Sequence, residues 1–376
     1  MRRVDKQEHT EKMKRIRAKP ESELTQLEQL QLGSAPILGL HSDFSHWDWD
    51  NLSINDSRGT YFPASPLREP FHSLYQHSAD TALRLTRRLC NHAITAWRQL
   101  HRLDFNRRGT PISLELTFPW DTQILWGGTR EYLWGRGMWG PQVIKCALHA
   151  LDSWAFDQIE AGAEPDDVIR HVVEGHESVA PLAIAIGVAL EARLISKTTL
   201  PLVTNQRLWH ADIQRWVDEQ SSSQTKLIGY ERSSSDRPHI EAIQKDFERP
   251  CRKMELRQLV PLFALCENDR LREGAQTAIQ NFPNDLPYEF EEQRKNDSYS
   301  HDLMETAVNW AEWGKPENYR RAKIPEKPNE QLIYLKNPKS EEPKAVEATQ
   351  RHEQNIREMA LYGWVTDTFE KGTLST

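Results

Sequence analysis

The apolar residues between positions 67 and 218 recur every three or four residues, which is the spacing of helices with one buried face. Short connections separate the periodic segments, so consecutive helices are expected to pack as hairpins. The sequence therefore predicts a mostly all-α protein of stacked helical hairpins, either a solenoid or an arrangement like an α/α toroid. The clearest stripes are Ala82, Leu85, Leu89, Ala93 and Trp97; Val143, Ala147, Leu151, Trp154 and Ile159; and Leu208, Trp209, Ile213, Trp216 and Val217.

Three boundaries within this region have sequence signals. Ser78 is suited to cap a helix start, so residues 67–100 form either one long helical face or a helix pair. Pro165 is placed to open a short helix that Gly175 closes, and Asn205 is suited to cap the helix that follows it.

One segment, Ser178 to Leu190, is apolar on every face of a helix. Such a helix is stable in water only when neighbouring helices cover it on all sides. Glu177 and Glu191 bound the run, and it is too short to span a bilayer. We therefore expect a central, fully buried helix in a soluble, cytoplasmic protein.

Strand signals are few and short. The residues from Ile112 to Thr117 alternate between apolar and polar, and Pro111 and Pro119 on either side confine a strand there to a sheet edge. A second short strand is expected at Ile333 to Leu335. The fold is therefore predicted to contain short edge strands at most, together with irregular Trp-rich loops.

Composition along the chain suggests four parts. Residues 1–35 are charged and read as a lead-in helix or linker, and residues 36–218 form the helical core domain. Residues 219–250 contain two serine-rich runs and are predicted to be a polar linker. Residues 251–376 are expected to form a second helical subdomain that ends in a charged C-terminal helix.

The overall charge argues against several classes of partner. A net charge of −7 and a pI near 6.1 provide no basic field for nucleic acid or an anionic membrane. Only residues 1–20 are locally basic, which leaves RNA or DNA contact through that arm as a weaker alternative. The four cysteines are scattered and are expected to be reduced, in keeping with a cytoplasmic location: Cys90, Cys146, Cys251 and Cys266.

The patterns that identify catalytic and cofactor sites do not occur. The phosphate-binding loop, the dinucleotide-binding glycine motif and the serine nucleophile elbow are all missing. His171 and His176 flank Glu174, but histidines five residues apart point about 140° apart on an ideal helix and cannot share a metal. The sequence therefore predicts no catalytic residue, no cofactor and no metal ligand.

The segment from Leu125 to Gly140, LWGGTREYLWGRGMWG, has the most unusual composition of the chain. Five glycines and three tryptophans lie within it, so backbone freedom is combined with large aromatic side chains. Arg and Trp are enriched at interface hot spots, which makes this segment a candidate binding surface. In the structural alternative, which the usual burial of Trp favours, the tryptophans wedge between helices. The candidate binding residues are Trp126, Arg130, Tyr132, Trp134 and Arg136.

Several segments together resemble a known family. They are FPASPLREPFHSLYQHSADTALRLTRRLCNHA, TREYLWGRGMWGPQVIKCALHALDSWAFDQIEAG, VVEGHESVAPLAIAIGVAL and the W-x-E-W-G-K-P-E-N-Y stretch from Trp310 to Tyr319. In this order they resemble the helical region of large bacterial STAND-like ATP-binding proteins of antiphage defence. This chain departs from that family because no position matches its nucleotide-binding module.

The resemblance implies a non-enzymatic scaffold or sensor that acts through protein–protein contacts, with an ATPase subunit or by self-association. The chain would then be a fragment of a split gene, a separate subunit, or a descendant that has lost the ATPase. An α/α-toroid enzyme acting on carbohydrate is the alternative, with the aromatic segment stacking on sugar beside Asp121 or Glu131.

Overall fold

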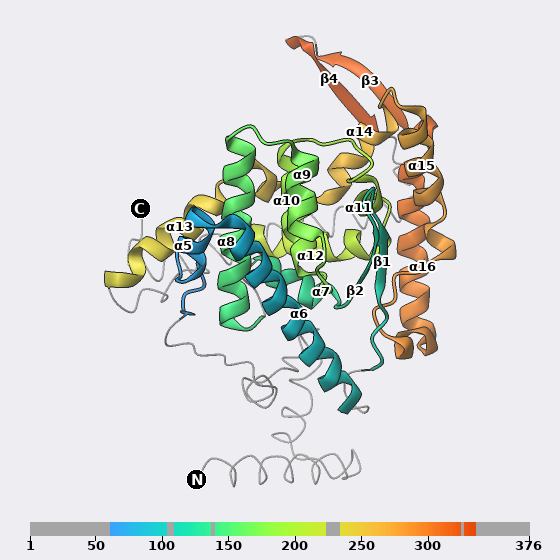
Figure 1. Ribbon diagram of the computed structural model, residues 1–376. Helices are drawn as coiled ribbons and strands as arrows, with labels where there is room; N and C mark the ends of the chain where they lie inside the picture. The colour runs from blue at the N-terminus through green and yellow to red at the C-terminus, as the bar shows by residue number, and fades with distance from the viewer. Residues whose placement is uncertain (1–60, 104–108, 137–139, 223–233, 325–326, 336–376) are drawn as a thin grey trace, which may run out of the picture.

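The described part of the chain is mostly helical in a computed structural model that covers residues 61–103, 109–136, 140–222, 234–324 and 327–335 (Figure 1). It begins with α5 (Phe71–His77) and α6 (Ala79–Leu103). Between them the Ser78 N–H donates to the Leu74 carbonyl at 2.8 Å, and the Ser78 carbonyl accepts from the Ala82 N–H at 3.0 Å. Ser78 therefore ends one helix and begins the next, so this region is a helix pair.

Helix α10 (Ala180–Glu191) lies at the centre of the molecule, and every residue from Ala180 to Leu190 is buried. It packs against α8 (Gln142–Glu160), α9 (Pro165–Val173) and short segments from later in the chain. The predicted central helix is thus confirmed. Because α10 is apolar on every face, neighbouring segments surround it. The described helices show neither a solenoid nor a closed ring.

The boundary signals of the helical region agree with the structure. Helix α9 begins at Pro165 and Gly175 follows it with a φ of +75°, a backbone conformation that favours glycine. Helix α12 (Gln206–Ser222) is preceded by Asn205, whose Oδ1 accepts from the Leu208 N–H at 3.3 Å. Both predicted helix starts are confirmed.

The strands form two antiparallel hairpins. β1 (Leu114–Thr117) pairs with β2 (Thr122–Leu125), and the buried Leu114 and Leu116 alternate with the exposed Glu115 and Thr117. The short strand predicted near residue 112 is therefore confirmed. β3 (Tyr319–Ile324) and β4 (Lys327–Leu335) form a ribbon that projects from the helices at the top of Figure 1, and β4 contains the predicted strand at residues 333–335.

Residues on both sides of the predicted division after residue 218 contribute to one hydrophobic core, and the four-part division stays a prediction. The expected linker of residues 219–250 contains the end of α12, η3 (Ser234–Asp236) and α13 (Arg237–Phe247). Beyond it, Leu256, Phe263 and Ile279 belong to the same hydrophobic core as Trp97 of α6. Residues 223–233, which include part of both serine-rich runs, lie outside the described residues.

The C-terminal part of this core is built largely from short helices. Those that follow α13 are η4 (Pro250–Lys253), η5 (Leu256–Leu259), α14 (Val260–Ala264), α15 (Asp269–Gln280), η6 (Phe282–Asn284), η7 (Glu291–Lys295), α16 (Asp297–Ala311), η8 (Glu312–Gly314) and η9 (Pro316–Asn318). The remaining short helices are α7 (Thr129–Tyr132), η2 (Leu133–Arg136) and α11 (Leu200–Val203). The predicted lead-in segment of residues 1–35 and the charged terminal helix lie outside the described residues.

Three of the four cysteines are buried in the interior. Cys90, Cys146 and Cys251 are buried and Cys266 is partly buried, all as free thiols. Among the described helices, none combines the length and apolar character needed to cross a membrane.

Candidate functional site

The five candidate binding residues lie in two different environments. Tyr132, Trp134 and Arg136 are buried, with exposed fractions of 1%, 1% and 5%. Trp126 and Arg130 are half-buried, and the Arg98 guanidinium lies 3.8 Å from the centre of the Trp126 ring. Burial favours the structural interpretation for the first three, whereas a binding role for Trp126 and Arg130 stays a prediction.

Two glycines of the aromatic segment, Leu125 to Gly140, allow it to pack closely. A Cβ on Gly135 would lie 2.3 Å from the carbonyl oxygen of Ala180, at the start of α10. A Cβ on Gly140 would lie 2.8 Å from the ring of Trp134. A side chain tolerates neither distance, so Gly135 allows the backbone of η2 to pass against α10, and Gly140 leaves room for the Trp134 ring.

Arg136, at the end of η2, joins three helices through its guanidinium group. Its Nε donates to Glu219 Oε1 of α12 at 2.7 Å, and its Nη1 donates to Asp152 Oδ2 of α8 at 3.0 Å. Its Nη2 donates to Asp246 Oδ2 of α13 at 2.6 Å. One buried side chain thereby connects residues that are far apart in the sequence.

Two further arginines bind the carboxylates that Arg136 contacts. Arg252 of η4 donates to Asp152 at 2.5 Å and to Asp246 at 2.8 Å. Arg215 of α12 donates to Asp212 at 2.6 Å and to Glu219 at 2.5 Å. We call the whole set the buried ion-pair network, which comprises Arg136, Arg215, Arg252, Asp152, Asp212, Glu219 and Asp246.

Two neutral donors, a hydroxyl group and a backbone N–H, also bind Asp212. Its Oδ1 accepts from the Tyr132 hydroxyl at 2.6 Å, and its Oδ2 accepts from the Leu256 N–H at 2.7 Å. The hydrogen bond explains why Tyr132 is buried, because a buried tyrosine hydroxyl needs a partner. The aromatic segment, α12 and the start of η5 therefore meet at one carboxylate.

The network contains four carboxyl groups and three guanidinium groups, so its charge does not balance when all are ionised. Burial raises the pKa of Asp152, whose Oδ1 has no hydrogen-bond partner. Burial also opposes ionisation of Asp246, but Arg136 and Arg252 outweigh it and hold the pKa of that carboxyl well below its ordinary value. A proton on Asp152 would leave three charges of each sign, which is the arrangement that a low-dielectric interior favours.

This arrangement is suited to fixing structure. Each carboxyl group of the network is bound by at least one arginine, and the elements that it connects are η2, α8, α12, α13 and η4. Removing one member of such a cluster leaves an uncompensated charge in the interior. The network therefore holds these segments in a single relative position.

A second polar cluster lies at the start of α7. Glu131 Oε2 accepts from the Gly128 N–H at 2.8 Å, and Glu289 Oε1 accepts from the Thr129 N–H at 2.6 Å. Arg207 donates to the carbonyl oxygen of Gly127 at 2.9 Å. Burial raises the pKa of Glu131 to about 7, and the neighbouring charge of Glu289 adds to the effect.

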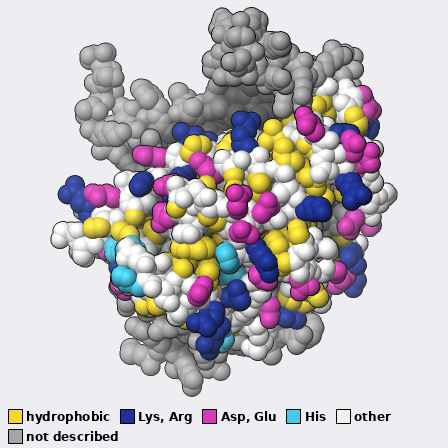
Figure 2. Space-filling view, turned by 45° about the horizontal axis from the view of Figure 1, so that its top comes forward, with side chains coloured by type: hydrophobic (Ala, Val, Ile, Leu, Met, Phe, Trp, Pro, Cys, Tyr) yellow, Lys and Arg dark blue, Asp and Glu magenta, His cyan; other side chains and the backbone are white. Residues whose placement is uncertain are grey.

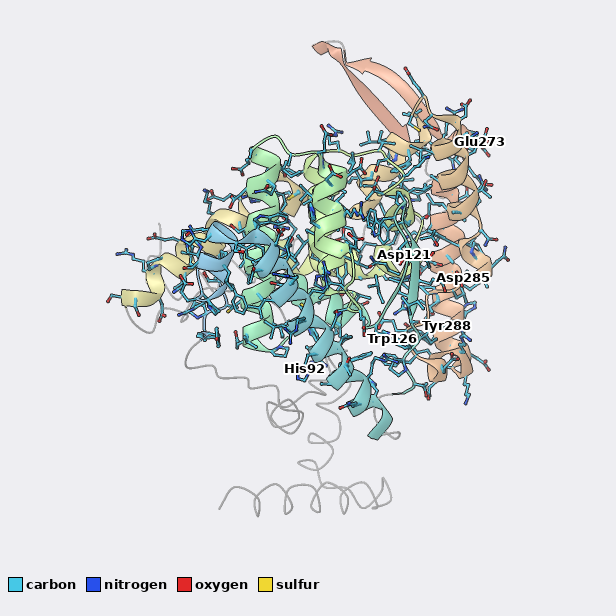
Figure 3. All side chains as sticks on the ribbon, viewed as in Figure 1. His92, Asp121, Trp126, Glu273, Asp285 and Tyr288 are labelled. Carbon is cyan, nitrogen blue, oxygen red and sulfur yellow. The ribbon has the colours of Figure 1, made fainter. Side chains whose placement is uncertain are left out.

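The space beside this cluster is small. A hollow lined by Gly128, Thr129, Arg207 and Glu289, among others, has room for about one water molecule. Asp121 lies apart from it, exposed at the turn between β1 and β2, where its Oδ1 accepts from the Thr122 N–H at 2.8 Å (Figure 3). The hollow is too small for a sugar ring, and the carbohydrate alternative with Asp121 or Glu131 stays a prediction.

The histidine pair of α9 and the following turn is also separated. His176 is buried, and burial lowers its pKa to about 3, whereas His171 is exposed. Glu174 pairs with Arg170 at 3.0 Å on the surface. Within the described ranges, no cluster of three or more His, Cys, Asp or Glu side chains is placed to hold a metal ion.

Sequence reasoning missed the acidic half of the network. Asp152 and Asp246 lie in helices whose polar residues read as solvent-facing, and three of their four contacts with Arg136 and Arg252 join residues 16, 100 and 110 positions apart. One local signal was present in α12, where Arg215 has Asp212 three residues before it and Glu219 four residues after it.

The fold and these clusters define a mostly helical protein with a charged, internally paired interior. No model of a known protein family matches the chain, and no curated protein matches it. The resemblance to STAND-like defence proteins therefore stays a prediction.

Proposed function

We propose that this chain is a non-enzymatic helical scaffold or sensor module of a bacterial antiphage-defence ATPase system. It acts in the cytoplasm through protein–protein contacts, with a separate ATPase subunit or with further copies of itself. The sequence resemblance provides the link to the ATPase system. The structure supports the scaffold part of the proposal.

The observation that carries the proposal is the buried ion-pair network. Its seven charged side chains are committed to one another and to backbone groups, so they stabilise one shape of the body. A scaffold needs such a body, because a contact made on one face must be presented in a fixed position relative to the others.

The surface offers places for protein contacts. Among the residues whose exposure the structure describes, four large apolar side chains are well exposed: Ile124 at 54%, Val308 at 49%, Val217 at 43% and Met304 at 39%. Figure 2 shows apolar side chains interspersed with acidic and basic ones over the face that it presents. Mixed surfaces of this kind are typical of non-obligate interfaces.

The proposal includes two more specific expectations, one about the architecture and one about the contact residues. The solenoid or α/α-toroid-like arrangement of helical hairpins stays a prediction for the chain beyond its mostly helical character. Trp126 and Arg130 stay the candidate contact residues of the aromatic segment, since they are the two that reach the surface.

The test uses the full chain and the proteins encoded by the adjacent reading frames. The tagged chain is co-expressed with each neighbour, purified, and assayed for a stoichiometric ATPase subunit and for ATP hydrolysis by the complex. We expect an ATPase to co-purify and the isolated chain to show no turnover. Turnover of ATP or of an oligosaccharide by the isolated chain would contradict the proposal.

A matched control comes from the candidate contact residues. Exchange of Arg130 for Glu should weaken capture of the ATPase if this residue lies in the interface. Exchange of Arg170, which is exposed on α9 and pairs with Glu174, should leave capture unchanged. Equal effects of both exchanges would remove Arg130 from the proposed surface.

A further inference from the structure

Helix α6 presents a basic stripe to solvent. Its exposed residues recur at spacings of three and four and lie on one side of the helix, with an acid at the N-terminal end followed by the arginines: Asp80, Arg84, Arg88, His92, Thr95 and Gln99. The whole helix carries five arginines and a single acid, Asp80. Arg84 donates to Thr81, and within the described residues neither Arg84 nor Arg88 is paired with a carboxylate. These two positive charges are therefore available to an acidic partner.

Helix α16 has the opposite character. It carries three acids and no lysine or arginine, and its exposed residues include Asp302 and Glu305. Met304 and Val308, one turn apart, are exposed on the same helix at 39% and 49%. An apolar pair beside acidic side chains is the composition expected of a contact surface that recognises a basic partner.

The two surfaces match in length and lie on different parts of the molecule. The stripe from Arg84 to Gln99 and the helix α16 each extend about 22 Å at 1.5 Å per residue. Figure 1 shows α6 across the front of the molecule and α16 along its right-hand edge. In Figure 3, His92 marks the stripe, and the acidic residues Glu273 and Asp285 lie on the side where α16 is found.

From this complementarity we propose that the α6 stripe of one copy docks on the exposed face of α16 of a second copy. Arg84 and Arg88 face Asp302 and Glu305 across the contact, and Met304 and Val308 are covered by it. This inference rests on the proposed function and names self-association as one of its contacts.

Because the two surfaces are different, the contact is head-to-tail. Each copy offers α6 to one neighbour and α16 to another, so association continues into a ring or a filament and does not stop at a two-fold dimer. The charges also make it sensitive to ionic strength, since exposed ion pairs are screened within about 8 Å at physiological salt.

The experiment is a charge-reversal cycle on the full chain, followed by sedimentation velocity over a range of concentrations at low salt. The wild-type protein should form species larger than the monomer. Exchange of Arg84 and Arg88 for Glu, or of Asp302 and Glu305 for Lys, should weaken association by about tenfold or more, because like charges then meet. The variant with all four exchanges should associate again, since both surfaces have changed sign.

The control variant exchanges Arg237 and Lys245 for Glu. Both residues are exposed on α13, and the change in net charge equals that of the α6 double variant. It should associate like the wild-type protein. Equal loss in this control would show that net charge alone governs association and would overturn the inference.

Two other outcomes also overturn it: a wild-type chain that stays monomeric at low salt, and a fourfold variant that stays monomeric. Binding of a short labelled DNA duplex that requires Arg84 and Arg88, without self-association, would assign the stripe to nucleic acid instead. A monomeric chain that still captures an ATPase subunit would reject this contact and leave the proposed function standing. A self-associating chain that by itself turns over ATP or an oligosaccharide would keep this contact and reject the proposed function.

Discussion

Charged side chains are arranged in opposite ways inside the molecule and on its surface. In the buried ion-pair network, arginines and carboxylates from distant segments alternate, and each charge lies within 3.0 Å of one of opposite sign. On the surface helices the signs are separated, with arginines on α6 and acids on α16. The interior therefore uses its charges within the chain, whereas Arg84 and Arg88 of α6 have no carboxylate partner among the described residues.

The difference follows from solvation. A charge moved from water into the interior loses several kcal/mol of hydration, and only close partners restore it. On the surface, water provides that stabilisation, so a stripe of one sign persists without partners and creates a field that attracts the opposite sign. Charge exchanges should accordingly affect folding in the first case and association in the second.

The largest expected effect comes from the centre of the network. Exchange of Arg136 for Met removes the shared partner of Asp152, Glu219 and Asp246 while filling most of its volume. We expect the free energy of unfolding in urea to fall by about 3–5 kcal/mol. The control is Arg170→Met on the exposed pair with Glu174, for which little or no change in the free energy of unfolding is expected. A similar small change for Arg136 would mean that the network does not stabilise the fold.

The aromatic segment provides a second comparison between interior and surface. Trp134 is fully buried, so Trp134→Ala should lower the free energy of unfolding by about 3–5 kcal/mol. Trp126 is half-buried and contacts Arg98, and Trp126→Ala should cost about 1 kcal/mol. Urea unfolding of both variants measures the difference, and equal losses would reject the division of this segment into a structural and a surface part.

Glu131 gives a prediction with a defined pH dependence. Its pKa in the folded state is about 7 and lies above the unfolded value of 4.5, so the folded state retains the proton to higher pH. Stability from this group is complete below pH 4.5 and is lost as the pH rises toward 7, by up to about 3 kcal/mol. Gln carries no charge and still accepts from the Gly128 N–H. Glu131→Gln should therefore stabilise the protein at pH 8 and change little at pH 4.5.

Urea unfolding at these two pH values checks this prediction. Glu115, which is exposed on β1, provides the control, because Glu115→Gln should change the free energy of unfolding little at either pH. A stabilisation by Glu131→Gln that is the same at both values would contradict the assignment of the shift to burial.

The smallest effect on folding is expected at the α6 stripe. Arg84→Glu with Arg88→Glu changes two exposed residues that have no carboxylate partner among the described residues, so the free energy of unfolding should stay within about 0.5 kcal/mol of the wild type. Urea unfolding at moderate salt measures it. A larger loss would show that the stripe contributes to the fold.

The sequence predicted those parts of the fold that depend on local pattern. The apolar run of α10, the proline at the start of α9 and the Asn205 cap each produced a correct element, because their physical cause lies within a few residues. The fully apolar α10 also indicated that it would be central, since no other position is stable for such a helix in water.

The candidate site depended on contacts that no local pattern encodes. Arg136 looked like an interface residue because its three carboxylate partners lie 16, 83 and 110 positions away. For the same reason the composition of the predicted linker, residues 219–250, did not reveal that Asp246 within it pairs with Arg136. Only the pairing of distant segments in the folded chain shows that Arg136 belongs to a buried network and not to a binding surface.

The most direct test of the account measures folding and association on the same two variants. Arg136→Met should lower the free energy of unfolding by about 3–5 kcal/mol and leave the association of the folded protein at wild-type strength. The double exchange of Arg84 and Arg88 for Glu should do the opposite, with unchanged stability and weakened association in sedimentation velocity. Loss of association in the first variant, or loss of stability in the second, would contradict the separation of interior and surface charges on which the account rests.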